Sequence, residues 1–411
     1  MAKEVAQDKK GRVIAALDIG TTKVSLAIGV CQGEQLDVIG VGEAPSAGIR
    51  QGVVVNIEST AEAIRKAREE AELMAGVKID SVYLAVGGSH VQSFHSSGMI
   101  AIRHKEVRQE DIDRVIEAAK AVAIPQDRQV LHVLPQDFKI DGQAGIYDPI
   151  GMSGVRLEAS VYIITGSQSA IINAIKCTQK AGLKVSEVVL QQLASALSVL
   201  SDDEKNLGVS VVDMGGGTCD IISFFQGSVI HTGLVPVGGI NFTQDVAIGL
   251  KTTQTHAETL KKKYGCALPE LVDEDEAIEV ESVRGRKPRT LMKRDLCEVI
   301  EARAEETLEL IHDELKEKNL THKLGSGVVL TGGASLLQGL VEMGDFILDV
   351  PVRRGLPNRV SGLVDVVKQP SYATVVGLLM YGKEKTNDRS AVKDHAADWT
   401  DKLKNFLGLG V

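Results

Sequence analysis

The sequence has no excess of basic residues, and aromatic residues are scarce. Its 411 residues contain 46 Lys and Arg against 55 Asp and Glu, so the formal net charge is −9. This balance argues against a general nucleic-acid binder, because such domains are usually basic. Aromatic residues make up 3% of the chain, and the one tryptophan, Trp399, stands close to its end. We therefore expect Trp399 to lie outside the core.

Paired cysteines and long apolar runs are also missing. The five cysteines are scattered, with no C-x-x-C pair and no histidines at zinc-site spacing, which argues against a disulfide framework or a structural zinc site. No apolar run approaches the ~18 residues that a membrane-spanning helix needs. Residues 1–12 are polar and charged, unlike a signal peptide. These absences predict a protein of the reducing cytosol.

A strand–turn–strand pattern occurs twice in what is otherwise an ordinary globular composition. Apolar strands predicted at 13–17 and 24–29 have counterparts at 208–212 and 219–225. Helices and further strands follow each copy, which predicts a repeated α/β unit. Between 87 and 165 the pattern changes to strands around one helix, which predicts an inserted α+β subdomain.

Both copies end their first strand in Asp-x-Gly and continue with small residues. The first reads Asp18-Ile19-Gly20-Thr21-Thr22-Lys23, and the second reads Asp213-Met214-Gly215-Gly216-Gly217-Thr218-Cys219-Asp220. Glycines at such turns let backbone N–H groups point into one concavity, which suits a phosphate. An aspartate at the strand end can hold Mg²⁺ through water. Two such turns facing each other would hold a nucleotide triphosphate from both sides.

A third cluster, Gly332-Gly333-Ala334, follows a predicted strand and opens a helix. Its glycines allow close approach of a ring or ribose, and the helix N-terminus adds N–H donors. A tight turn without a ligand would explain any one of the three clusters. The three in this order predict a nucleotide site.

This order of motifs resembles the actin/Hsp70/sugar-kinase superfamily. The resemblance implies bound ATP and Mg²⁺, with Asp18 and Asp213 holding the metal through water, and crossing helices at 190–196 and 372–377. It also implies that a polar residue at the start of the first crossing helix orients water or the metal shell, and we expect Gln192 rather than Gln191 to do so, together with Asp213. The resemblance places Glu258 and Lys261 near the ribose; the alternative is an ordinary exposed helix face.

Within this superfamily the chain is identified as a member of the FtsA family of bacterial cell-division proteins. The resemblance covers essentially the whole chain and is carried by Gln192–Ser195, Tyr264–Leu268, Leu330–Ala334 and Tyr381–Lys383. It implies an ATP-binding protein that polymerises, binds the tubulin-like FtsZ through the FtsZ C-terminal peptide, and anchors the Z ring to the cytoplasmic face of the inner membrane at the septum. It also implies recruitment of later division proteins. Whether ATP is hydrolysed is left open.

The family implies an actin-like fold of two lobes, that is, duplicated RNase H-like domains with an inserted α+β subdomain and a C-terminal amphipathic helix. The expected divisions are a leader (1–12), the first part of subdomain 1A (13–86), the inserted subdomain 1C (87–165), the second part of 1A (166–200), lobe 2 with 2A and 2B (201–360), a return helix (361–382), a linker (383–394) and the amphipathic helix (395–411).

The last residues carry an apolar stripe at helical spacing. Trp399, Leu403, Phe406 and Leu407 fall on one face of a 3.6-residue helix, with charged residues on the others. A terminal helix docked on its own domain, or on a partner helix, is one reading. The preceding polar segment and the tryptophan favour a membrane-surface anchor.

Residues 270–294 change from acidic to basic along the chain. A solvated loop or hairpin explains this pattern. A longitudinal polymer contact or a site for the FtsZ tail is the alternative. The family resemblance implies that the FtsZ C-terminal peptide docks on the subdomain that includes this region, with Arg284, Arg286 and Lys293 as candidate partners for its acidic residues.

Two other functions fit the nucleotide motifs. A small-molecule kinase of the same superfamily would need a carboxylate base facing a substrate cleft, and no residue is assigned to that role. An Hsp70-like chaperone would need a substrate-binding domain after the ATPase core, and the sequence has none.

Overall fold

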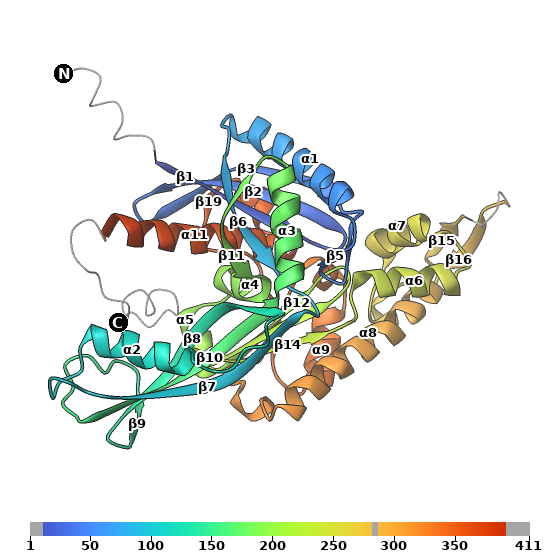
Figure 1. Cartoon of the computed structure of the whole chain (residues 1–411). Coiled ribbons are helices and arrows are strands. Elements are labelled where there is room, and N and C mark those ends of the chain that lie inside the picture. The colour runs from blue at the N-terminus through green and yellow to red at the C-terminus, as the bar shows by residue number, and fades with distance from the viewer. Residues whose placement is uncertain (1–10, 282–286, 392–411) are drawn as a thin grey trace.

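The computed structural model describes residues 11–281 and 287–391, with side chains placed up to residue 386. The chain forms two lobes, each built on a mixed sheet, and a third sheet extends from their junction (Figure 1). Among the described residues, each helix is too short or too polar to cross a bilayer.

The sheet of lobe 1 has the strand order β11-β6-β1-β2-β3-β19. Helices α1 and α3 cover one face, and α4 and α11 cover the other. Its strands are β1 (Arg12–Ile19), β2 (Lys23–Gln32), β3 (Gln35–Pro45), β6 (Ser81–Val86), β11 (Lys184–Leu190) and β19 (Ser361–Gly362), and its helices are α1 (Ile57–Ala75), α3 (Gln168–Lys180), α4 (Gln191–Val199) and α11 (Ala373–Ala391); the small ribbon β4 (Ile49–Arg50) and β5 (Val53–Val54) lies between β3 and α1.

Helix α1 shows how the sequence builds this lobe. The Asn56 side chain accepts a hydrogen bond from Ser59 N (3.0 Å) and caps the first turn, and Gly76 ends the helix with φ 67°. An alanine row on the buried face lets the helix approach β3 closely, since a β-carbon at Gly42 would lie 2.0 Å from the Ala67 carbonyl oxygen. The small alanine side chains of the helix and the glycine of the strand together permit this close packing.

The sheet of lobe 2 has the order β14-β13-β12-β17-β18, which repeats β3-β2-β1-β6-β11 of lobe 1. In both sheets a three-strand antiparallel meander continues into two parallel strands. The predicted duplication is therefore confirmed. The strands are β12 (Val209–Met214), β13 (Cys219–Phe225), β14 (Ser228–Val235), β17 (Val328–Thr331) and β18 (Val352–Arg354), and the helices are α5 (Asp202–Leu207), α6 (Gly239–Gly249), α7 (Gln254–Tyr264), α8 (Lys293–Glu317) and α9 (Leu340–Leu348). The short helix α10 (Val364–Val367) belongs to lobe 1, because Val367 packs in the core of that lobe.

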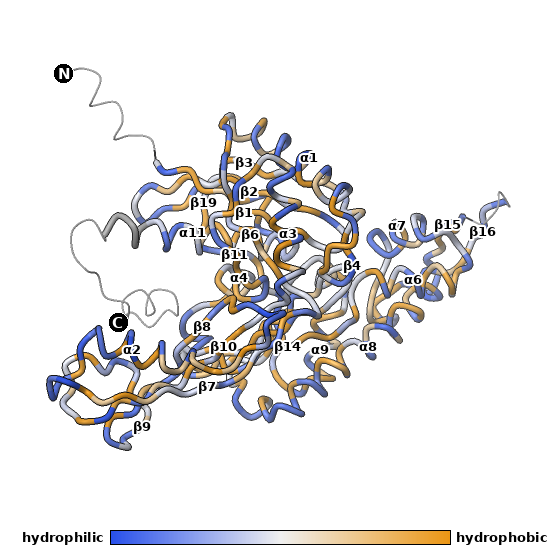
Figure 2. The backbone as a smooth tube through the Cα atoms, viewed as in Figure 1, coloured by the Kyte–Doolittle hydropathy of each residue, from blue (hydrophilic) through white to orange (hydrophobic). Residues whose placement is uncertain are grey.

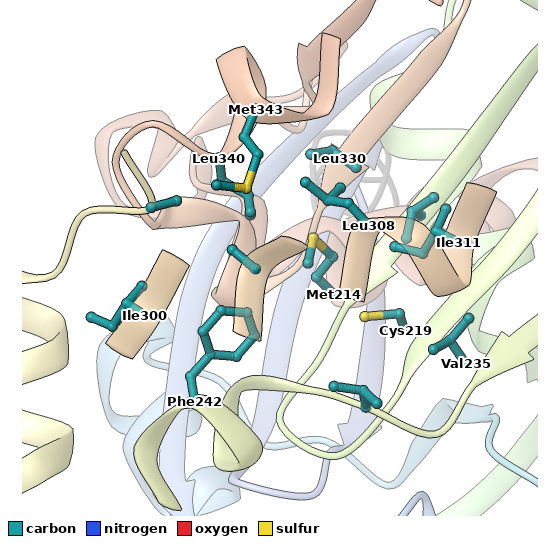
Figure 3. Packing of buried hydrophobic residues seen from close by; sticks show 14 of the residues in the cluster. Met214, Cys219, Val235, Phe242, Ile300, Leu308, Ile311, Leu330, Leu340 and Met343 are labelled. Atoms are coloured by element: carbon teal, nitrogen blue, oxygen red, sulfur yellow. The ribbon is translucent and has the colours of Figure 1, made fainter. Parts of the chain in front are cut away.

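The main core of lobe 2 lies between this sheet and its helices. Met214 and Leu330 from the strands pack against Leu308 and Ile311 of α8 and Phe242 of α6 (Figure 3). The polypeptide is hydrophobic along the strands of both lobes and hydrophilic at the outer loops (Figure 2). The strand ends that carry the glycine clusters lie at the junction of the lobes (Figure 1).

Helices α4 and α11 cross between the lobes, as expected for the two small-residue segments. A β-carbon at Gly377 would lie 1.7 Å from the Ala194 carbonyl oxygen, so only glycine permits this crossing. The Ser195 and Thr374 hydroxyl oxygens are 2.9 Å apart across the same contact. The crossing thus brings hydroxyl groups of both helices to the carboxyl ends of β1 and β12.

The inserted subdomain is a four-stranded sheet of order β7-β10-β8-β9 with one helix packed on it. It also touches lobe 2, since Gln136 Nε2 donates to the Val229 carbonyl of β14 (2.9 Å) and Thr232 N donates to the Tyr162 hydroxyl (2.8 Å). Its elements are β7 (Val91–Ala101), α2 (Gln109–Lys120), β8 (Arg128–Ile140), β9 (Gln143–Ile146) and β10 (Arg156–Ser167).

One segment differs from expectation, and another adopts one of the two forms expected for it. Residues 383–391, predicted as a linker, are helical, because α11 continues to Ala391. The charged stretch 270–294 includes a hairpin, β15 (Ala277–Val280) paired with β16 (Arg289–Met292), at the edge of lobe 2 (Figure 1). The amphipathic segment 395–411 lies outside the described residues.

Candidate functional site

A cleft of about 890 Å³ lies between the two lobes, and most of the predicted nucleotide-site residues line it. Residues from both Asp-x-Gly turns and from the third glycine cluster share this one space. The predicted residues that line it are Asp18, Gly20, Thr21, Thr22, Lys23, Asp213, Gly215, Gly216, Thr218, Glu258, Lys261, Gly332, Gly333 and Ala334.

The two turns touch each other at the bottom of the cleft. A β-carbon at Gly216 would lie 2.4 Å from Thr22 Cγ2, and one at Gly217 would lie 3.1 Å from Thr21 Cγ2. Gly217 therefore serves as a contact for Thr21 and is not among the residues that line the cleft. The contact holds the exposed backbone of both turns around one space, where N–H groups suit an anion.

Two carboxyl groups stand at the ends of β1 and β12, the half-buried Asp18 and the buried Asp213. Burial, and then the charge of Asp213, raise the pKa of Asp18 from 3.8 to about 7. Burial also raises the pKa of Asp213, against hydrogen bonds from Ser195 Oγ (2.6 Å) and Thr374 Oγ1 (3.1 Å). Two carboxylates that repel each other in a buried site fit a divalent cation. Within the described ranges no group of three or more His, Cys, Asp or Glu side chains forms a cage, so Mg²⁺ would keep water ligands here.

Asp220 is a further buried carboxyl group, which the sequence analysis did not assign. It pairs with Asp213 across β12 and β13, and Thr218 Oγ1 donates to its Oδ2 (2.8 Å). Burial raises its pKa to about 7, against that hydrogen bond, and the charge of Asp213 adds to the rise. An acid within an otherwise apolar strand is the signal that could have identified it.

The third glycine cluster contacts the second turn. Gly332 has φ 80°, and a β-carbon there would lie 2.4 Å from Asp213 Oδ1. Arg354, a second residue that sequence reasoning missed, holds the following loop, because its Nε donates to the Ser335 carbonyl (2.9 Å) and its Nη2 to the Leu337 carbonyl (3.3 Å). No local pattern marks this residue, because it comes from β18.

Glu258 and Lys261 face the cleft together. Lys261 Nζ lies 2.7 Å from Glu258 Oε2 and donates to the Gly239 carbonyl and to Thr243 Oγ1, both at 2.8 Å. Although burial raises the pKa of Glu258, hydrogen bonds from Lys261 and Thr243 keep it below its ordinary value. The pair forms a fixed polar wall, not the exposed helix face of the alternative reading.

Lys23 lines the cleft but is already engaged. Its ammonium group pairs with Glu43 and lies 4.2 Å from the centre of the Tyr372 ring. Burial, and then Glu43, raise the pKa of Tyr372. Lys23 therefore ties β2 to β3 and to the start of α11.

The prediction that Gln192 rather than Gln191 faces the site is wrong. Gln191 lines the cleft, and its side chain donates a hydrogen bond that opposes the rise in the pKa of Asp213 caused by burial. Gln192 is 2% exposed and does not line the cleft. Neighbouring residues on a helix point about 100° apart, and the packing of α4 on α11 determines which one faces the cleft.

The other predicted residues lie elsewhere. Lys293 pairs with Glu276 at 2.7 Å beside the β15–β16 hairpin. Arg284 and Arg286 lie outside the described residues, as do Trp399, Leu403, Phe406 and Leu407.

Comparison with known proteins identifies the family. The model described as "SHS2 domain inserted in FTSA" matches residues 88–165, and "Cell division protein FtsA" matches residues 210–377. Cell division protein FtsA of Pseudomonas aeruginosa is 48% identical over 385 residues, covering 93% of this chain and 92% of that protein. The chain belongs to the FtsA family. FtsA of Escherichia coli K12 is 40% identical over 415 residues, covering 98% of each chain.

Solved structures share the architecture at lower identity. A PilM–PilN type IV pilus biogenesis complex matches with a TM-score of 0.63 at 16% identity, covering 90% of this chain and 98% of that one. MreB5 of Spiroplasma citri bound to ADP matches with a TM-score of 0.55 at 12% identity, covering 93% and 99%. The chain is thus an FtsA-family cell-division protein with an actin-like fold and an inserted SHS2 domain.

Proposed function

We propose that the interlobe cleft binds ATP with Mg²⁺ and that bound nucleotide controls self-assembly of this FtsA-family protein. One observation carries the proposal: two glycine turns from duplicated lobes and a third glycine cluster line the same cleft beside the carboxyl groups of Asp18 and Asp213, whose pKa values are both raised by desolvation. The nucleotide content of an actin-like relative supports it, since MreB5 of Spiroplasma citri was solved with ADP and with AMPPNP.

Different residues would contact different parts of the nucleotide. The turns at Gly20–Thr22 and Gly215–Thr218 would hold the phosphates through backbone N–H groups and hydroxyls. Asp18 and Asp213 would hold Mg²⁺ through water, and the cation would neutralise phosphate charge. Glu258 and Lys261 would meet the ribose, and Gly332–Ala334 would lie against the base. Gln191 replaces Gln192 as the residue that orients water in the cleft.

Assembly and attachment complete the proposed function. The protein polymerises, binds the FtsZ C-terminal peptide near the β15–β16 hairpin, and attaches the Z ring to the inner membrane through the apolar stripe of residues 399–407. Partial burial of four apolar side chains would contribute about 4 to 8 kcal/mol before the cost of ordering the helix. Single tails would exchange, whereas a filament with many tails would stay attached through effective concentration.

Negative-stain electron microscopy on lipid monolayers tests the proposal. Purified full-length protein with Mg²⁺ and ATP should form filaments on the monolayer, and should not do so with EDTA in place of Mg²⁺. Filaments of equal number without nucleotide would contradict the proposed control by ATP.

A further inference from the structure

His90 stands where the chain enters the inserted subdomain, and both nitrogens of its half-buried ring are inaccessible to solvent. Neither nitrogen has a hydrogen-bond partner among the described residues. Buried polar atoms in folded proteins are almost always paired with protein or ordered water. The ring therefore points to a missing partner.

A small cavity lies beside this ring. Its volume is about 20 Å³, which is enough for one water molecule. Among the residues that the structure describes, His90 and Gln191 provide the only polar side chains that line it, and the rest of this lining is apolar or glycine. The size and the two polar side chains match a single ordered water.

Gln191 connects this cavity to the cleft. It lines both spaces. On the cleft side, its side chain donates a hydrogen bond to Asp213. This hydrogen bond lowers the pKa of Asp213, which burial raises. Its amide oxygen lies toward Gly87, where a β-carbon would be only 2.7 Å away. That oxygen therefore lies on the side of Gly87, which also lines the small cavity.

We propose that one ordered water in this cavity donates to a ring nitrogen of His90 and to the amide oxygen of Gln191, and that His90 is a positioning residue for Gln191. A neutral imidazole has one acceptor nitrogen, and a water molecule has two O–H donors, so one water can serve the ring nitrogen and the amide oxygen together. The bridge fixes the Gln191 amide with its nitrogen toward Asp213. Only the effect on nucleotide rests on the proposed function.

The backbone of His90 is held by the inserted subdomain. Arg128 Nη2 donates to the His90 carbonyl (2.9 Å) and to the Thr165 carbonyl (3.0 Å), so one guanidinium joins the first and last strands of the insertion. Ser167 N also donates to the His90 carbonyl (3.3 Å). A shift of the insertion would move the ring, then the water, then Gln191. The root of the insertion is therefore coupled to the cleft.

The first test is a high-resolution crystal structure of the nucleotide-free full chain. We expect a water peak within hydrogen-bond distance of both a His90 ring nitrogen and Gln191 Oε1. A dry cavity, or a water that contacts only one of the two, would overturn the proposal. This measurement does not depend on nucleotide binding.

The second test is the affinity for a fluorescent ADP analogue. His90→Phe keeps an aromatic ring but loses the acceptor, and Ala170→Val fills the cavity from α3 without changing His90. Each should weaken binding about threefold to tenfold, the loss of one bridging hydrogen bond. His90→Gln should stay near wild type, as should the control His104→Phe, whose residue is exposed.

The two tests distinguish failure of the His90 positioning role from failure of the proposed nucleotide binding. Wild-type affinity in both His90→Phe and Ala170→Val would overturn the positioning role even if the water is present. If the wild-type protein itself binds no nucleotide, the proposed function fails, and the crystal structure alone decides whether the water bridge exists. If His90→Phe does not fold, Ala170→Val carries the affinity test.

Discussion

Thr22 in the first turn packs so closely on Gly216 in the second that a β-carbon at Gly216 would lie 2.4 Å from Thr22 Cγ2. The contact joins residues from the two halves of the duplicated fold. It closes the bottom of the cleft and sets the separation of the two turns. Glycine at 216 is therefore required by a neighbour from the other lobe and not only by local turn geometry.

The first prediction concerns this contact. Gly216→Ala should lower the free energy of unfolding by about 1 to 3 kcal/mol through overpacking and should weaken nucleotide binding, because the turns are pushed apart. Thr22→Ala removes the methyl group that collides, so the double variant should be more stable than the sum of the single effects predicts. Denaturant unfolding measures the cycle.

Gly333→Ala is the control for that cycle, since the atom nearest to a β-carbon at Gly333 would be 3.9 Å away. It should leave the unfolding transition unchanged. Strict additivity of Gly216→Ala and Thr22→Ala would show that the two turns do not meet as described.

The second prediction concerns how the stability of the Mg²⁺-free protein depends on pH. The pKa of Asp220 is about 7 in the folded protein because of burial, against 3.8 ordinarily. The folded state then binds more protons than the unfolded state between these values, so stability falls as the pH rises through this window. Asp220→Asn removes the effect. The melting temperature of the variant minus that of wild type should therefore be about 2 to 5 °C higher at about pH 8 than at about pH 5.

Differential scanning calorimetry at the two pH values provides the test. The exposed Asp113, changed to Asn, should show the same difference from wild type at both. An Asp220→Asn effect that is independent of pH, or larger in acid, would contradict the assigned burial of this carboxyl group.

The third prediction concerns the loop after Gly332. Arg354→Ala leaves the Ser335 and Leu337 carbonyls without their donor, so the loop should loosen and nucleotide affinity should fall about fivefold to tenfold. Arg359→Ala is the matched control, because its side chain is 48% exposed and is 3.7 Å from Asp202. Equal affinities in isothermal titration calorimetry would remove Arg354 from the site.

The fourth prediction concerns the apolar stripe of the tail. Trp399→Glu places a charge on its apolar face and should abolish flotation of the protein with liposomes, since binding by the tail is weak. Nucleotide affinity should not change, because the cleft is formed by other residues. Undiminished flotation would reject the tail as the membrane anchor.

The sequence predicted the sheets better than it predicted side-chain direction. The strand predicted at 219–225 has the observed bounds, Cys219–Phe225, because a short and largely apolar run between two glycine-containing turns leaves little choice. The one helix expected in the inserted subdomain is also present, as α2 (Gln109–Lys120). The duplicated Asp-x-Gly turns also located the cleft, because strand ends of related sheets come to equivalent places.

The errors have different causes. Polar residues at 383–391 suggested a linker, but they contain no glycine or proline that would stop α11. The choice between Gln191 and Gln192 depends on how α4 packs against α11, which residue types alone do not reveal. Arg354 acts on a loop from another strand, so no spacing marks it.

Equilibrium titration of the wild-type protein and Asp213→Asn with a fluorescent ATP analogue, with and without Mg²⁺, tests the central claim most directly. Asp213 is buried beside Asp18 at the cleft, so we expect wild-type affinity to rise with Mg²⁺. In Asp213→Asn that rise should be lost, with affinity at least about tenfold weaker in Mg²⁺. Equal, Mg²⁺-enhanced binding by both proteins would contradict the assignment of this cleft as the Mg·ATP site.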